Sequence, residues 1–125
     1  MNKSIKRLPD GEFAILKTIW QLPAPTTSAQ IMAKLGQSNH WKPQTLLTVL
    51  ARLTEKGFLE SVRKGRERQY TALISEEEYL EVETSDFLKR CSGHSMGGLV
   101  KTLFSSNSLS EHELDELRSL LNKES

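Results

Sequence analysis

Residues 43–57 read PQTLLTVLARLTEKG, and this stretch decides the fold. A proline at the first position and a glycine at the last are residues that typically mark the two ends of a helix. Between them, apolar residues recur at spacings i, i+3, i+4 and i+7, namely Leu46, Val49, Leu50 and Leu53. Since this spacing places them on one side of a helix, we predict a helix from Pro43 to Lys56 whose apolar face is buried.

The opposite face of this helix is polar without being crowded by charge. Glutamine can form two hydrogen bonds to adenine, and threonine can donate, accept or contact a thymine methyl group. Flanking cations can hold phosphates, and an aromatic residue at the start of the helix can pack on a sugar-phosphate chain. We therefore predict a DNA-contacting surface made of Trp41, Lys42, Gln44, Thr45, Thr48 and Arg52.

After this helix the apolar period changes from helical to alternating. Residues 58–63 and 68–73 each predict a short strand, and the turn between them, Lys64-Gly65-Arg66-Glu67, contains the glycine that a hairpin needs. Its tip is basic. We expect Lys64, Arg66 and Arg68 to contact phosphates or the minor groove of DNA.

Two shorter helices are predicted ahead of this one. Asp10 is a suitable N-cap for a helix over residues 10–21, which a pair of prolines ends. Residues 26–27 are predicted to be extended, and Ser28 is predicted to cap the second helix. Three helices followed by a basic hairpin is the order of a winged helix-turn-helix domain, which we assign to residues 1–74.

Residues 75–125 predict three more helices. Ser75 caps a long acidic helix, Gly93 breaks it, and Ser110 with Glu113 forms a capping box for the last one. The apolar stripes are too wide for exposed helices in so small a chain, which favours burial against a second copy. We expect dimerisation through Leu80, Phe87, Leu99, Val100, Leu103, Phe104, Leu114, Leu117 and Leu121. Packing of these stripes on the winged domain of the same chain is the alternative.

The predicted fold is therefore mainly α: three helices and a β-hairpin wing, followed by a C-terminal helical dimerisation domain. The charges divide in the same way. Residues 1–74 hold 12 basic and 5 acidic side chains, a balance of +7, whereas residues 75–125 hold 5 basic and 11 acidic ones, a balance of −6. A basic half joined to an acidic half fits a polyanion-binding module joined to an assembly module.

Other classes of function find little support in the sequence. His40, His94 and His112 are scattered without further metal ligands at suitable spacing, so we expect no metal site, no other cofactor and no enzyme activity. Cys91 lies on an apolar stripe, which favours packing over a nucleophilic role. A single cysteine and the absence of an apolar run of about 20 residues predict a cytoplasmic protein without a membrane span.

Two blocks of the sequence carry a resemblance to a known family. They are Leu8-Pro9-Asp10-Gly11-Glu12-Phe13 with Ile19-Trp20, and Trp41 to Leu53 with Lys56-Gly57-Phe58-Leu59. They resemble the BlaI/MecI/CopY family of bacterial repressors. Tyr70 is similar to its second wing strand and Leu109 to Leu121 to its terminal helix, so the resemblance covers nearly the whole chain. It implies a homodimer that binds an operator with dyad symmetry in double-stranded DNA, commonly upstream of β-lactamase or related genes.

The resemblance also carries expectations about release of repression. In the penicillinase branch, a membrane sensor-protease cuts the dimerisation domain, and the corresponding bond here joins Thr102 to Leu103. The penicillinase repressors have Asn-Phe at that bond. The copper branch ends in a cluster of cysteines, which this chain lacks. Family members often have a basic residue at the position of Leu47, and the penicillinase branch has lysine at Gln44, so we expect fewer cations on the helix and a different operator sequence.

Two other functions stay open on the sequence alone. A winged helix can dock a protein instead of DNA, although the strongly basic front half argues against this. A ligand-sensing repressor of the multidrug type would need a pocket between the domains, and no residue marks one.

Overall fold

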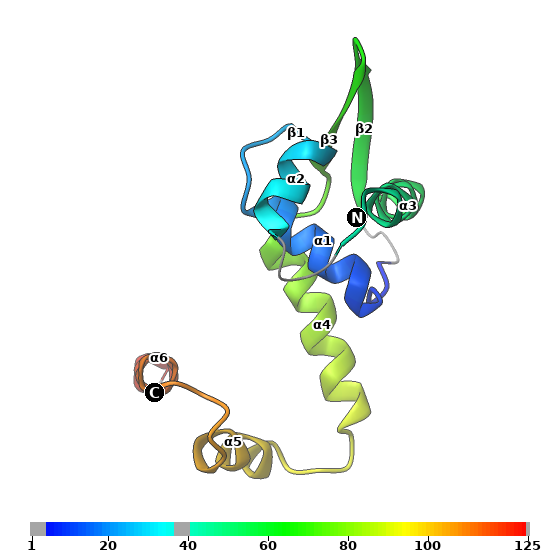
Figure 1. Cartoon of the computed structure of the whole chain (residues 1–125). Coiled ribbons are helices and arrows are strands. Elements are labelled where there is room, and N and C mark those ends of the chain that lie inside the picture. Colours follow the sequence, from blue (N-terminus) through cyan, green and yellow to red (C-terminus); the bar gives the residue numbers. More distant parts are fainter. Residues whose placement is uncertain (1–4, 37–40, 125) are drawn as a thin grey trace. The chain divides into compact units, whose positions relative to one another are not determined.

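The computed structural model describes residues 5–36 and 41–124, which form six helices and one small sheet. The elements follow the order α1 (Asp10–Trp20), β1 (Thr26–Thr27), α2 (Ser28–Leu35), α3 (Pro43–Glu55), β2 (Leu59–Lys64), β3 (Glu67–Ala72), α4 (Glu76–Arg90), α5 (Met96–Ser105) and α6 (Glu111–Glu124). This order confirms the predicted winged helix-turn-helix followed by helices (Figure 1). None of the helices in the described ranges is long and apolar enough to cross a membrane.

The chain divides into two compact units, the first ending at Phe87 and the second beginning at Leu88. The first unit therefore contains most of α4 besides the winged helix. The functional boundary predicted between residues 74 and 75 stays a prediction.

The core of the first unit lies where the first three helices meet the sheet. Helix α1 contacts α2, α3 and β3, while α3 also contacts β2. The predicted apolar stripe of α3 is buried, because Leu46, Leu50 and Leu53 are fully inaccessible and Val49 is nearly so. Burying this stripe leaves the opposite face of α3 free, as the sequence predicted.

The wing is a two-stranded hairpin whose inner strand, β3, also pairs with β1. All pairs are antiparallel, in the order β1-β3-β2. Lys64 pairs with Glu67, so the turn consists of Gly65 and Arg66 alone. Gly65 has a φ of 63°, which glycine adopts readily. Each strand therefore runs one residue closer to the tip than predicted.

Two predicted helix caps are wrong by one residue. Pro9 is the N-cap of α1 and Asp10 is already helical, where its charge still suits the positive end of the helix. Thr27 caps α2 in place of Ser28: its Oγ1 accepts from the backbone N–H of Gln30 at 3.2 Å, and Gln30 Oε1 accepts from the Thr27 N–H at 2.9 Å. Pairing of β1 with β3 keeps Thr27 extended, which is the backbone conformation of an N-cap.

Tyr79 joins α4 to the core of the winged helix. Its side chain is fully buried, and its ring lies 5.0 Å from that of Phe13 and 5.9 Å from that of Phe58. Its hydroxyl accepts from the Leu8 backbone N–H at 2.6 Å and donates to Glu83 at 2.7 Å. Pattern analysis of the sequence did not predict this contact, because Leu80 and Phe87 were the apolar residues to which it gave a role on this helix.

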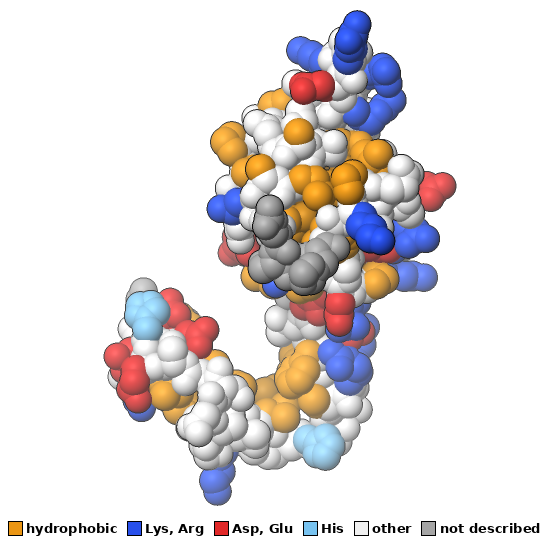
Figure 2. Space-filling view, viewed as in Figure 1, with side chains coloured by type: hydrophobic (Ala, Val, Ile, Leu, Met, Phe, Trp, Pro, Cys, Tyr) orange, Lys and Arg blue, Asp and Glu red, His pale blue; other side chains and the backbone are white. Residues whose placement is uncertain are grey.

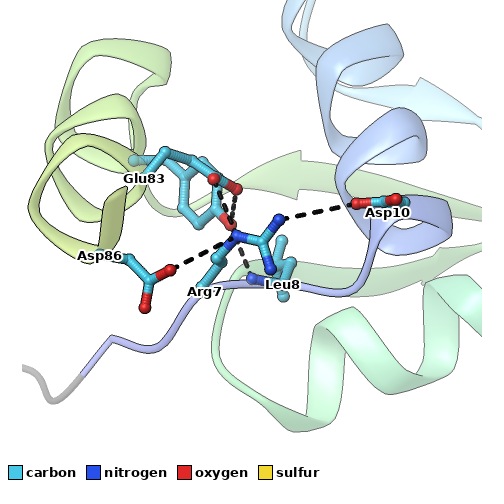
Figure 3. A network of polar contacts seen from close by, with 6 residues as sticks. Arg7, Leu8, Asp10, Glu83 and Asp86 are labelled. Atoms are coloured by element: carbon cyan, nitrogen blue, oxygen red, sulfur yellow. Dashed lines mark hydrogen bonds and ion pairs between the residues drawn. The ribbon is translucent and has the colours of Figure 1, made fainter. Parts of the chain in front are cut away.

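A polar network surrounds the Tyr79 hydroxyl (Figure 3). Arg7 Nε donates to Glu83 Oε1 at 3.1 Å, and the guanidinium also lies near Asp86 at 3.8 Å and Asp10 at 3.9 Å. The hydrogen bond to Glu83 raises the pKa of Arg7. The segment before α1 is thereby connected to α4 by charged as well as apolar contacts.

Tyr79→Phe is expected to keep the ring in place but to leave the Leu8 N–H without its partner. Such a loss costs about 1–3 kcal/mol. Burial raises the pKa of Tyr79 to about 12, above the value of about 10 in an unfolded chain. The native chain should therefore lose stability as pH rises from about 10 through 12, since only the neutral form is favoured in the fold. Urea unfolding between pH 8 and 12 should show a shallower decline in the variant, and equal declines would contradict this role.

The second unit holds two capped helices. Ser95 accepts from the Gly98 N–H, and Ser110 forms the predicted capping box with Glu113. Arg118 lies 5.8 Å from the ring centre of Phe104, which connects α6 to α5. Among the residues predicted to dimerise, Leu99, Val100, Phe104, Leu114 and Leu117 are half-buried, whereas Leu80, Phe87, Leu103 and Leu121 are exposed.

Candidate nucleic-acid interface

The exposed face of α3 carries two neighbouring rows of side chains. Gln44, Thr48 and Arg52 follow one another at four-residue intervals, and all three are exposed. Beside them runs a second row, Leu47, Ala51 and Glu55, which is exposed as well. Within the first row the Thr48 hydroxyl donates to the Gln44 carbonyl at 3.1 Å, so its oxygen can still accept a hydrogen bond from another group.

The other predicted residues of α3 lie at its start. Lys42 is the N-cap and is exposed, as is Thr45. Trp41 is half-buried and packs against the core, and its ring would lie 3.9 Å from a Cβ placed on Gly11. Its ring therefore packs the start of α3 against α1, and the DNA contact predicted for Trp41 stays a prediction.

The far end of α3 is held by an ion pair. Lys56 Nζ donates to Glu12, which lies on α1 and whose side chain is 8% exposed. A buried carboxylate needs a cationic partner, so this pair fixes the two helices relative to each other. Gly57 follows with a φ of 89° and turns the chain into the wing.

The hairpin carries the basic residues predicted for it. Lys64, Arg66 and Arg68 are exposed, and Lys and Arg side chains gather at the tip of the wing in Figure 2. Arg68 pairs in register with Arg63 on β2, and its guanidinium donates to the Ser61 hydroxyl at 2.9 Å. This bond directs Arg68 along the face of the hairpin.

An open groove of about 850 Å³ lies between the wing, α3 and the start of α2. It brings Arg66 and Arg68 together with residues that sequence reasoning missed, namely Thr27, Ser28, Leu47, Ala51 and Arg63. The other predicted residues are not part of its lining. Helical spacing from Gln44 and Thr48 marks Leu47 and Ala51 as their neighbours, and the hairpin register marks Arg63. The start of α2 gave no signal, because only the folded chain brings it here.

No group of three or more His, Cys, Asp or Glu side chains suited to a metal ion occurs in residues 5–36 and 41–124. His94 and His112 are exposed, and His40 lies outside the described residues. Cys91 is half-buried.

Comparison with known proteins gives the family. The family described as "Penicillinase repressor" matches residues 8–123. The chain belongs to the penicillinase repressor family. This membership confirms the resemblance seen in the sequence and places the chain among DNA-binding repressors, not enzymes.

Individual relatives agree with this membership. The penicillinase repressor of Bacillus licheniformis is 32% identical over 119 residues, which are 95% of this chain and 92% of that protein. The methicillin resistance regulatory protein MecI of Mammaliicoccus sciuri is 24% identical over 98% of this chain and 99% of that protein.

Solved structures bear out the winged helix. The DNA-binding domain of the repressor BlaI matches 62% of this chain and 94% of its own, with 32% identity and a TM-score of 0.53. Monomeric Bacillus licheniformis BlaI, solved in complex with the blaP half-operator, matches the same shares with a TM-score of 0.51.

Proposed function

We propose that this chain is a homodimeric repressor that binds an operator with dyad symmetry in double-stranded DNA and blocks transcription by occlusion. The observation that carries the proposal is the exposed polar row of α3 beside an arginine-lined groove and a basic wing. A helix face of this kind fits the major groove, while basic side chains fit phosphates. Binding to the chromosome places the protein in the cytoplasm.

Two observations support one subunit on each half-site. A 32% identical relative was solved as a monomer on a half-operator. In this chain, apolar side chains on α4, α5 and α6 are exposed, which suits burial against a second copy. We assign DNA binding to residues 1–74 and dimerisation to residues 75–125. Linking two half-site contacts raises affinity by about 10²–10⁴ over one.

The same coupling explains how cutting the second unit would end repression. The Thr102–Leu103 bond lies in α5, and Leu103 is 41% exposed. Cleavage there by a membrane sensor-protease would separate α6 from the rest of the chain. The two winged helices would then bind as monomers and lose the advantage of linkage.

Arg66→Ala is expected to weaken binding to every duplex and to lower the slope of log affinity against log salt by about one unit. The reason is that a wing arginine contacts phosphates, which every sequence presents. Thr48→Ala should instead relax preference at particular base pairs and leave the slope unchanged. Filter binding over a salt series, on a selected duplex and on random duplex, measures both.

The same experiment tests the proposed function. Salt-sensitive binding of the parent chain to random duplex is the expected result. Absence of salt-sensitive binding would favour a winged helix that docks a protein. Lys101→Ala is the matched control, because it removes one exposed cation of α5, outside the wing. It should leave the affinity for DNA and the salt slope as in the parent.

A further inference from the structure

We propose that Leu47 and Ala51 form an apolar reading pair that recognises thymine methyl groups in the operator. The proposal rests on the proposed function, because it assigns a specificity role at the same surface. Leu47 is 42% exposed, whereas the other three leucines of α3 are fully buried. Its exposure therefore separates it from the core stripe.

Leu47 and Ala51 lie on the part of α3 that would face the base edges. Leu47 follows Gln44 by three residues and precedes Ala51 by four, so both apolar side chains adjoin the polar row on the same exposed surface. A helix that presents this surface to the major groove brings both rows to the base edges. The apolar group displayed there by the four bases is the C5 methyl of thymine.

The charged side chains that line this groove indicate which kind of partner it binds. Arg63, Arg66 and Arg68 line it together with Leu47 and Ala51, and the acidic residues on the lining are Glu55 and Glu67. Arginines that line the same groove as exposed apolar side chains favour a polyanion that also displays methyl groups. Double-stranded DNA containing thymine meets both requirements, whereas an apolar protein helix gains nothing from the arginines.

The test replaces thymine with uracil, which lacks only the methyl group. A duplex is first selected from a random pool with the full chain, and each thymine is then replaced in turn. We expect at least one replacement in each half-site to weaken the parent about fourfold, the change that corresponds to about 0.8 kcal/mol for one buried carbon group. Leu47→Ala should bind thymine and uracil forms equally. Leu73→Ala removes an exposed leucine outside the groove and should behave as the parent.

Each other outcome counts against the inference. If uracil weakens no position while the duplex is still selected and salt-sensitive, the methyl groups are not read and only the proposed function stands. If uracil weakens Leu47→Ala as much as the parent, another side chain reads the methyl group. If Leu47→Ala weakens all duplexes alike, Leu47 packs on sugars. Failure to select any duplex would overturn the proposed function itself. Thermal unfolding of Leu47→Ala, whose side chain is exposed, verifies that the variant folds.

Discussion

Leu121→Glu is expected to lower operator affinity by about 10²–10⁴ without touching the DNA-binding surface. Leu121 lies on α6 and is 57% exposed in the single chain, so the substitution removes no contact of the chain's own core. A carboxylate at an apolar interface is desolvated without a partner, which opposes dimerisation. Monomers would then bind one half-site each and lose the linkage.

A matched substitution separates dimerisation from charge. Ser119→Glu adds the same carboxylate on α6 at an exposed position on the opposite side of the helix, and should leave affinity unchanged. Sedimentation equilibrium gives the oligomeric state, and gel shifts on a selected duplex give the affinity. A dimeric Leu121→Glu chain that binds like the parent would contradict the assigned interface. A monomeric one that binds like the parent would contradict the role of dimerisation.

Tyr79→Ala is expected to lower the free energy of unfolding by about 3–5 kcal/mol, the usual cost of removing a buried aromatic ring. The ring fills the space between Phe13, Trp20 and Phe58, and its hydroxyl is hydrogen-bonded on both sides. Against a typical stability of about 5–15 kcal/mol, this loss threatens the whole winged helix.

Urea unfolding of the variant measures this loss directly. Glu81→Ala changes an exposed neighbour on α4 and should cost little, which isolates the contribution of the buried ring. A loss below about 1 kcal/mol for Tyr79→Ala would show that α4 contributes little to the first unit. The loss should also exceed that of Tyr79→Phe, because the phenyl ring keeps most of the packing.

The sequence predicted those features that local chemistry decides. The stripe of α3 and the turn at Gly57 follow from helical spacing and glycine conformation, and both are present in the structure. Polar groups at Ser75 and Ser110 cap their helices as expected. These features depend on residues a few positions apart, which a sequence displays directly.

Features that depend on distant residues were missed. The cap of α2 moved to Thr27 because β3 holds β1 extended, a contact across more than 40 residues. Tyr79 is buried because its ring packs against Phe13 of α1 and against Phe58, and neither contact is visible in the sequence around Tyr79. Trp41 was assigned to DNA alone, whereas the fold buries half of it. In each case, a tertiary contact decided between local alternatives.

In the candidate interface, too, features set by nearby residues were predicted and features set by distant residues were missed. The sequence identified the polar row of α3 and the cations of the wing, because helix period and charge mark them. It passed over Leu47 and Ala51 as reading residues, because their significance comes from the groove that α2 and the wing form beside them. The helix α3 itself has few cations. In the folded chain its polar row and its exposed apolar residues lie on one surface, and the hairpin adds arginines to the same groove.

Selection of bound duplexes from a random pool by the full-length chain tests the central claim most directly. The account predicts enrichment of an inverted repeat whose half-sites are separated by a whole number of helical turns, since two copies of α3 must enter the major groove on one side of the DNA. Gln44→Ala and Thr48→Ala should each relax the enriched sequence at particular positions of both half-sites. A pool that stays random after repeated rounds, or a motif that neither variant changes, would contradict α3 as the reading helix.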